Sequence, residues 1–101
     1  MDLNRLFVYG TLREARVQDS VIGRRVVGRP ARLYGYTKDS IRQGLSVYPI
    51  LAAADPRQFV DGEVLDLTTQ ELERTDEYEG APYRRLRVTV DSGDACWVYM
   101  Q

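Results

Sequence analysis

The sequence has 101 residues, enough for one domain with a single hydrophobic core over residues 1–101. Hydrophobic residues make up 44% and charged residues 29%, and the net charge of −1 argues against non-specific nucleic-acid binding. Without histidine, and with Cys96 as the one cysteine, the chain can form no Ser-His-Asp or Cys-His nucleophile system, histidine-ligated metal site or intrachain disulfide. The sequence therefore excludes histidine-ligated and multi-cysteine metal sites, and it leaves a carboxylate with a raised pKa to carry protons near neutral pH.

The sequence also predicts where the protein resides. No run of residues approaches the ~20 apolar residues of a membrane span. The first five residues lack the basic and then apolar plan of a signal peptide. We therefore expect a cytoplasmic protein that does not associate with membranes.

The first third of the chain predicts two strands and a short helical segment. The apolar run 6–9 is typical of a buried strand, and Gly10 ends it. Residues 13–22 have weakly helical apolar spacing and predict a short helix or an ordered loop. Residues 24–36 are rich in valine and tyrosine and predict a strand, with Pro30 at a bulge or on an edge because proline lacks the donor of a sheet ladder.

The middle of the chain is harder to assign until residue 59. An apolar segment over 45–51 is interrupted by Tyr48-Pro49, and 52–57 predicts a loop. Residues 59–67 predict a strand.

A helix follows that strand. Thr68 and Glu71 match a capping box that starts it. It should end at Tyr78 or Glu79, with Gly80 as a left-handed C-terminal residue and Pro82 barring extension.

The remaining residues predict a β-hairpin. Residues 83–90 alternate, with Leu86, Val88 and Val90 on one face, and 91–94 form a turn before a partner strand over 95–100. The expected fold is α+β, with five or six strands and one or two helices. A small mixed sheet curled toward a barrel would protect its edges.

Two carboxylates of the predicted helix point inward. Leu72 should face the core, and Asp76 and Glu79 follow it at spacings of four and seven, near the buried stripe. Burying a charge is expensive unless it is paired or protonated, so either acid could pair with Arg84 or Arg85 of the next strand. At the helix C-terminus the macrodipole should raise the pKa of Glu79, as a general base acting on an ammonium needs.

A second candidate site is the glycine turn at the end of the first strand. Tyr9, Gly10, Thr11 and Leu12 form a strand end followed by a turn, whose consecutive backbone amides could hold a carboxylate or an oxyanion. A simple structural turn is the alternative. The Tyr48-Pro49 pair is a weaker signal, because such pairs usually serve packing.

Two surface interpretations concern the C-terminal hairpin. Arg85 and Arg87, with nearby tyrosines, could form a stacking surface for single-stranded nucleic acid, although alternating arginines usually mark a solvated face. Cys96 should pack as a small hydrophobe. Trp97 and Tyr99 share the other face of the last strand, and one of its two faces could line a homodimer contact.

Several of these motifs together resemble gamma-glutamylcyclotransferase-like proteins, in the branch of gamma-glutamylamine cyclotransferase and the plant avirulence-induced-gene proteins. The opening motif is Leu6-Phe7-Val8-Tyr9-Gly10-Thr11-Leu12-Arg13. The later motifs occur in the family's order across essentially the whole chain: Tyr48-Pro49, Val60-Asp61-Gly62-Glu63-Val64, Asp76-Glu77-Tyr78-Glu79-Gly80 and Tyr83-Arg84-Arg85.

The resemblance implies a small mixed barrel with a cavity at one end and a site that uses no cofactor. It implies that Glu79 is the catalytic acid/base, that Tyr9, Gly10, Thr11 and Leu12 hold the glutamyl moiety, and that Tyr83 lies beside the cavity. Tyr48 is a further expected substrate contact.

The implied reaction converts an L-γ-glutamyl compound to 5-oxoproline and a free amine. The α-amino group attacks the γ-carbonyl of its own glutamyl group, and the loop amides stabilise the oxyanion or fix the α-carboxylate. The substrate could be a γ-glutamyl amino acid, a γ-glutamyl-ε-lysine isopeptide or an intermediate of a specialised pathway, chosen by loops at 38–45 and 52–58. The alternative is a non-catalytic domain that binds a carboxylate-bearing metabolite or a peptide end in the same cavity.

Overall fold

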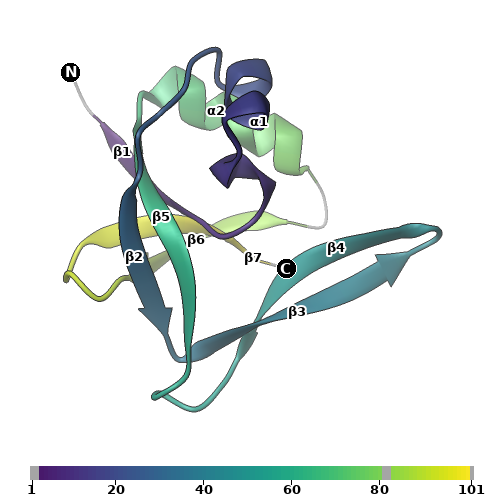
Figure 1. Cartoon of the computed structure of the whole chain (residues 1–101), viewed down its shortest axis with the longest axis vertical. Coiled ribbons are helices and arrows are strands. Elements are labelled where there is room, and N and C mark those ends of the chain that lie inside the picture. Colours follow the sequence, from purple (N-terminus) through teal and green to yellow (C-terminus); the bar gives the residue numbers. More distant parts are fainter. Residues whose placement is uncertain (1–2, 81–82, 101) are drawn as a thin grey trace.

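A computed structural model describes residues 3–80 and 83–100 and has a mixed α+β architecture (Figure 1). The elements in chain order are β1 (Asn4–Val8), a 3₁₀ turn η1 (Thr11–Arg13), α1 (Ala15–Val21), β2 (Arg29–Tyr34), β3 (Tyr36–Gln43), β4 (Ser46–Ala53), β5 (Phe59–Leu67), α2 (Thr69–Glu79), β6 (Arg84–Thr89) and β7 (Ala95–Met100). No helix in the described ranges is long and apolar enough to cross a membrane.

Five of the strands form one sheet in the order β2-β5-β1-β7-β6. The central strand, β1, runs antiparallel to β5 and parallel to β7, so the sheet is mixed. In the register of these pairs Leu6 lies opposite Leu65 on one side and Trp97 on the other. The end of β1, where Tyr9 and Gly10 follow, is therefore held from both sides.

The sheet is apolar on both faces, and the alternation of β1 shows why. Leu6 and Val8 belong to a cluster with Leu72, on the face that α1 and α2 cover in Figure 1. Phe7 and Tyr9 belong to the cluster on the opposite face, where Leu51 from the base of β4 also packs. Both clusters include residues from the end of β1. The end of this strand therefore lies between the two halves of the core.

Gly62 allows two of these strands to pack closely. A side-chain carbon at this position of β5 would lie 2.4 Å from the Val8 carbonyl oxygen and 2.6 Å from the Phe7 ring. Those separations are far below van der Waals contact, so a side chain here would displace β1. The glycine thus helps to fix the end of β1.

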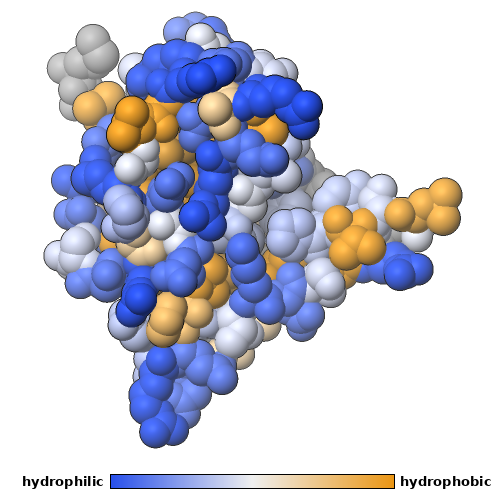
Figure 2. All heavy atoms as spheres, viewed as in Figure 1, coloured by the Kyte–Doolittle hydropathy of each residue, from blue (hydrophilic) through white to orange (hydrophobic). Residues whose placement is uncertain are grey.

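β3 and β4 form a separate two-stranded hairpin that projects from the body of the molecule (Figure 1). Apolar residues gather toward its far end in Figure 2, among them Leu45, which is fully exposed, and Val47, which is 57% exposed. The turn at Gly35 connects β2 to the hairpin, and hydrogen bonds from Gly35 N to Gln58 O and from Ala54 N to Gly35 O close its base. The hairpin is anchored at one end and free at the other.

The α+β prediction is confirmed, and the strand over 59–67 and the helix start and end match it. Residues 3–80 and 83–100 contain seven strands instead of the five or six expected, because β3 was predicted as a loop and β4 extends through Ala53. The described strands form two sheets, and neither closes into a barrel. Pro30 lies on the edge strand β2, as predicted, and Pro82 lies outside the described residues.

Candidate functional site

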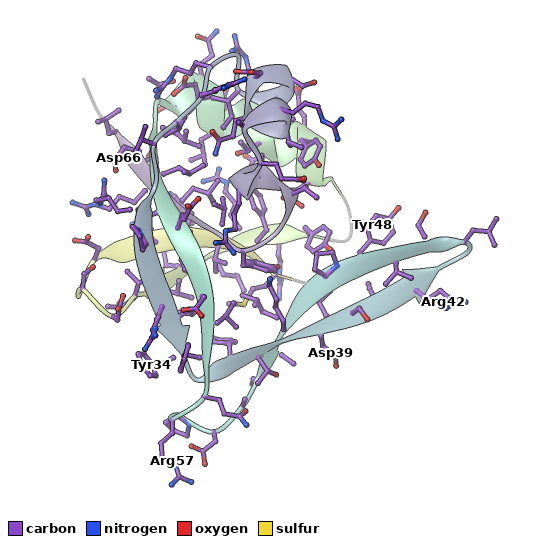
Figure 3. All side chains as sticks on the ribbon, in the orientation of Figure 1. Tyr34, Asp39, Arg42, Tyr48, Arg57 and Asp66 are labelled. Carbon is purple, nitrogen blue, oxygen red and sulfur yellow. The ribbon has the colours of Figure 1, made fainter. Side chains whose placement is uncertain are left out.

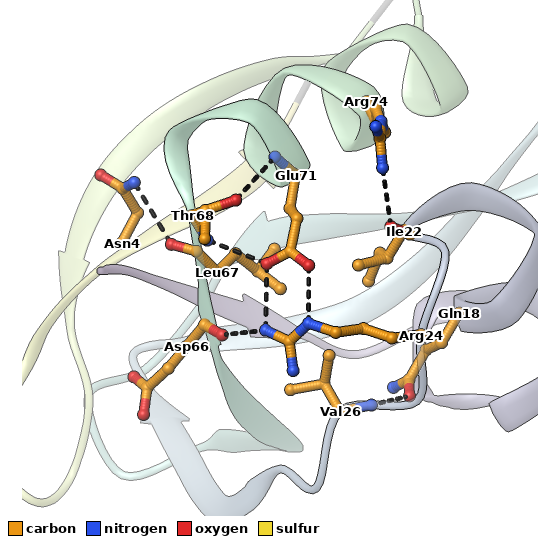
Figure 4. Close-up of polar contacts among 10 residues, drawn as sticks. All are labelled: Asn4, Gln18, Ile22, Arg24, Val26, Asp66, Leu67, Thr68, Glu71 and Arg74. Atoms are coloured by element: carbon orange, nitrogen blue, oxygen red, sulfur yellow. Dashed lines mark hydrogen bonds and ion pairs between the residues drawn. The ribbon is translucent and has the colours of Figure 1, made fainter. Parts of the chain in front are cut away.

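The first turn of α2 is a closed polar cluster (Figure 4). The Thr68 hydroxyl accepts a bond from Glu71 N, and the Glu71 carboxylate accepts one from Thr68 N, which completes the predicted capping box. Arg24 donates to both carboxylate oxygens of Glu71, at 2.6 and 3.0 Å. This guanidinium lowers the pKa of Glu71 despite its burial, so the carboxylate stays ionised and serves the fold.

The middle of α2 is held against β7 and β6 through Asp76. Arg85 Nε donates to Asp76 Oδ1 at 2.6 Å, and the Tyr99 hydroxyl donates to the same oxygen at 2.7 Å. The Thr75 hydroxyl lies 2.7 Å from that of Tyr99 and is fully buried. The pairing with Arg85 that the sequence offered as an alternative therefore applies to Asp76.

Glu79, one turn further on, is in a different situation. No hydrogen bond or ion pair reaches its carboxylate from residues 3–80 or 83–100, and burial alone raises its pKa from 4.5 to about 7. Gly80 follows with a positive φ of 58° and ends the helix, as predicted. The sequence thus places one unpartnered, poorly solvated acid at the end of a well-anchored helix.

Glu79 lies in the wall of a cavity of about 480 Å³, a volume typical of a small-molecule site. The seven residues singled out from the sequence all line it: Tyr9, Gly10, Thr11, Leu12, Tyr48, Glu79 and Tyr83. They come from the end of β1 and η1, from β4, from the last residue of α2 and from the residue before β6. The remaining lining residues are Phe7, Val8, Val47, Pro49, Tyr78 and Tyr99.

Three tyrosines next to Glu79 share its poorly solvated environment. Burial raises the pKa of Tyr9, Tyr83 and Tyr99, and the negative charge of Glu79 contributes to the shift at Tyr9 and Tyr83. The hydroxyl groups are therefore neutral at physiological pH. Each hydroxyl already donates its one hydrogen within the protein, to Tyr99 O, Pro49 O and Asp76 Oδ1 respectively, so it offers a ligand only its oxygen as an acceptor.

Hydrogen bonds link the walls of the cavity to one another. The Tyr9 hydroxyl donates to Tyr99 O at 2.8 Å, deep in the core. The Thr11 and Tyr78 hydroxyls lie 2.7 Å apart, which joins η1 to α2. Tyr83 donates its hydroxyl to Pro49 O at 2.6 Å and so ties the projecting hairpin to the start of β6.

The loop after β1 brings the first residues of η1 into the lining of the cavity. The first internal bonds of η1 run from Arg13 N to Gly10 O and from Glu14 N to Thr11 O. The amides of Thr11 and Leu12 precede those donors, as the first amides of any helical turn do, and both residues line the cavity. The prediction of an amide-rich turn agrees with this geometry.

Sequence reasoning missed Val47, Tyr78 and Tyr99 as lining residues. Tyr78 precedes Glu79 in the helix and was assigned only to the helix end. Tyr99 was assigned only to the same face of the last strand as Trp97; it is 5% exposed and packs with Leu72 and Leu6. The signal for Tyr99 was the strict alternation of β7, which points Tyr99 and Trp97 toward the helices and Cys96 toward the opposite core.

The arginines that were considered for nucleic-acid stacking are engaged with one indole. The guanidinium groups of Arg85 and Arg87 lie 4.6 and 4.3 Å from the centre of the Trp97 ring. Arg85 is also paired with Asp76. Cys96 is completely buried, as predicted for a small hydrophobe, and burial raises the pKa of its thiol.

Solved structures resemble this chain over nearly its full length. A solution structure from Arabidopsis thaliana is 29% identical to this chain, with a TM-score of 0.82. The match spans 99% of this chain and 62% of the Arabidopsis chain. A second Arabidopsis structure is 28% identical with a TM-score of 0.81, at 99% and 69% coverage. A structure named gamma-glutamyl cyclotransferase shares the fold, with 18% identity and a TM-score of 0.79. The match spans 99% of this chain and 67% of that chain.

Family membership rests on the sequence match. A search of curated proteins gave no significant match. The family model described as "Gamma-glutamyl cyclotransferase, AIG2-like" matches residues 6–101. That range contains every motif on which the resemblance was based, and the chain therefore belongs to the gamma-glutamyl cyclotransferase, AIG2-like family.

Proposed function

We propose that the protein is a cyclotransferase that converts an L-γ-glutamyl amine or amino acid to 5-oxoproline and the free amine. The observation that carries the proposal is the state of Glu79, a carboxyl in the cavity wall that has no partner among residues 3–80 and 83–100 and has a pKa of about 7. A free α-amino group has a pKa of about 8. Proton transfer between the two groups is therefore nearly balanced, as general base catalysis requires.

In the proposed reaction Glu79 accepts a proton from the substrate's α-ammonium group. The freed nitrogen attacks the γ-carbonyl carbon of the same molecule and closes a five-membered ring. The bond from that carbon to the amine nitrogen then breaks as the proton held by Glu79 passes to the departing nitrogen. The ring nitrogen gives up its second proton to form the neutral lactam, and the released amine takes up that proton as an ammonium. No further reactant is consumed, because ring closure and amine release balance each other.

The rest of the cavity supplies position and charge stabilisation. In this proposal the amides of Thr11 and Leu12 bind the oxyanion or the α-carboxylate, which is supported by the place of both residues in the cavity lining and at the start of η1. The hydroxyls of Tyr9 and Tyr83 stay neutral and border the same space. The attack is intramolecular in any setting, and holding the glutamyl chain curled keeps the nitrogen close to the carbonyl carbon, which supplies a large part of the acceleration. We further propose that the protein acts in the cytoplasm on a small molecule.

The test is release of 5-oxoproline from a panel of L-γ-glutamyl amines and amino acids, measured by mass spectrometry. Glu79→Gln should lower kcat/KM by about 10²–10⁴-fold while the fold is retained. Glu77→Gln is the matched control, because Glu77 is an exposed acid on the same helix. Equal loss in both variants, or full activity of Glu79→Gln, would contradict the role of Glu79.

The pH profile is a second readout of the same role. Because the base must be ionised, kcat/KM of the wild type should rise with pH and level off above about 7. If folded protein binds 5-oxoproline in a thermal-shift assay but turns over no member of the panel, the alternative of a non-catalytic binding domain replaces this proposal.

A further inference from the structure

The lining of the cavity divides into two parts with different chemistry. One part holds Glu79, Tyr9 and the amides of the turn after β1, which are the groups that the proposed reaction assigns to the glutamyl half of the substrate. The other part comes from the projecting hairpin and from Tyr78. Because one cavity must hold both halves of the substrate, the second part faces the amine half.

This second part, the hairpin wall, consists of Val47, Tyr48, Pro49 and Tyr78. It carries no charged group. Its polar atoms are partly engaged already, since the Tyr78 hydroxyl lies 2.7 Å from that of Thr11 and the Pro49 carbonyl accepts a bond from Tyr83. Val47 is 57% and Tyr78 45% exposed, so the wall presents apolar and aromatic surface. Figure 3 places Tyr48 on the side of the hairpin that faces the end of α2.

The hairpin wall is held in place before any ligand binds. The bond from Tyr83 to Pro49 O joins it to β6, and the ladder between β3 and β4 runs without interruption along its length, with Tyr48 opposite Ile41. An apolar wall of this kind gains free energy by being covered with apolar ligand surface. It offers no ionised group to a charged ligand, and beyond the hydroxyls and rings of Tyr48 and Tyr78 it has little to replace the hydration of a charge.

Charged side chains lie in a neighbouring, more open depression. Arg13 and Lys38 line it together with Glu14 and Glu63, so its charges compensate one another. It shares Tyr9, Gly10, Thr11 and Pro49 with the main cavity but not Val47, Tyr48 or Tyr78. Within the described part of the chain, no lysine or arginine lines the main cavity itself.

We infer that the preferred substrates are L-γ-glutamyl compounds whose amine is apolar and uncharged, and that Val47, Tyr48 and Tyr78 determine this preference. The inference rests on the proposed function and narrows its substrate class. It disfavours amines that carry an ammonium or a carboxylate at their far end, such as an ε-linked lysine.

The experiment compares three L-γ-glutamyl substrates of similar shape, derived from pentylamine, from putrescine and from γ-aminobutyrate. They differ in carrying a methyl, an ammonium or a carboxylate group at the far end. The wild type should convert the pentylamine derivative with a kcat/KM at least about tenfold higher than either charged one. The readout is 5-oxoproline by mass spectrometry.

A charge placed in the hairpin wall tests which residues are responsible. Val47→Glu should reduce the ratio of kcat/KM for the pentylamine derivative to that for the putrescine derivative by about tenfold or more. The reason is that the new carboxylate attracts the ammonium of the putrescine derivative. Leu45→Glu is the matched control, since Leu45 lies in the same hairpin, is fully exposed and does not line the cavity. Its ratio should remain that of the wild type.

The possible failures are distinguishable. Release of 5-oxoproline from the charged substrates at the same rate or faster would overturn the inference while the proposed function stands. An equal change of the ratio in Val47→Glu and Leu45→Glu would remove the hairpin wall as its cause. Absence of 5-oxoproline from all three substrates and from the wider panel would overturn the proposed function, and the inference with it.

Discussion

The two ends of α2 carry two partly buried glutamates with opposite properties. Glu71, in the first turn, is surrounded by donors from Thr68 and Arg24, and its pKa is lowered. Glu79, in the last turn, has no partner among the described residues, and its pKa is raised to about 7. The helix dipole favours a negative charge at the first position and disfavours it at the second. Burial of an acid therefore does not by itself indicate its role. An acid with hydrogen-bond and ion-pair partners stabilises the fold, whereas one without them remains available for chemistry.

The largest effect on stability is expected at Glu71. Glu71→Ala removes the acceptor of Thr68 N and the partner of Arg24, and it should lower the free energy of unfolding by about 2 kcal/mol. Glu71→Gln should lose less, because glutamine can still accept from Thr68 N. Urea denaturation at pH 7 measures both. An equal loss in the two variants would mean that the ion pair, not the capping box, carries the stabilisation.

The contribution of Glu71 should also depend on pH. Its pKa is lower in the folded than in the unfolded chain, so its stabilisation is present above pH 4.5 and is lost as the pH falls through the folded pKa. The difference in unfolding free energy between the wild type and Glu71→Ala should shrink accordingly in acid.

A smaller effect of opposite sign is expected at Glu79. Because its pKa is raised on folding, its ionisation costs stability as the pH rises from 4.5 through about 7. Glu79→Gln should therefore be more stable than the wild type by about 1–2 kcal/mol at pH 8, after allowance for solvent screening, and nearly equal to it at pH 4. Thermal denaturation across this pH range measures the difference. A variant that is less stable at pH 8 would reveal an unseen partner for the carboxylate.

The smallest effect is expected at Asp76, between the two ends. Asp76→Asn keeps an oxygen for the Tyr99 hydroxyl but loses the charge that pairs with a partly exposed Arg85, so stability should fall by about 1 kcal/mol or less. The acid limb of the kcat/KM profile should stay near pH 7, because burial and not Asp76 sets the pKa of Glu79. A shift of that limb would show that the two acids are coupled.

The sequence predicts those parts of the fold that carry local signals. The capping box at Thr68 and the glycine at 80 bracket α2, and the alternation over 83–100 defines β6 and β7. β3 has no such signal, because its residues are mostly polar and exposed and pair only with β4. Sheet order was likewise out of reach, since it depends on contacts between strands far apart in the chain.

The candidate site shows the same division. The inward position of Glu79 follows from its spacing to Leu72, and the amide turn follows from Gly10. Only the family resemblance predicted that these residues share one cavity with Tyr48. The hairpin reaches the site through the bond from Tyr83 to Pro49 O, a contact between distant segments that no local pattern indicates. Tyr78 and Val47 carried no signal, since an aromatic residue at a helix end and a valine in a strand are ordinary.

The central place of β1 in the sheet has a consequence for how the chain folds. β1 lies early in the sequence, but its partner strands β5 and β7 lie much later. The Tyr9 hydroxyl likewise bonds to the carbonyl oxygen of Tyr99, ninety positions away. A growing chain on the ribosome therefore holds this apolar strand unpaired until most of the sequence has emerged. Closing such long loops early is entropically costly, so folding should be slow for a chain of this size. During that interval the strand is exposed to aggregation and available to chaperones, and the cavity does not yet exist.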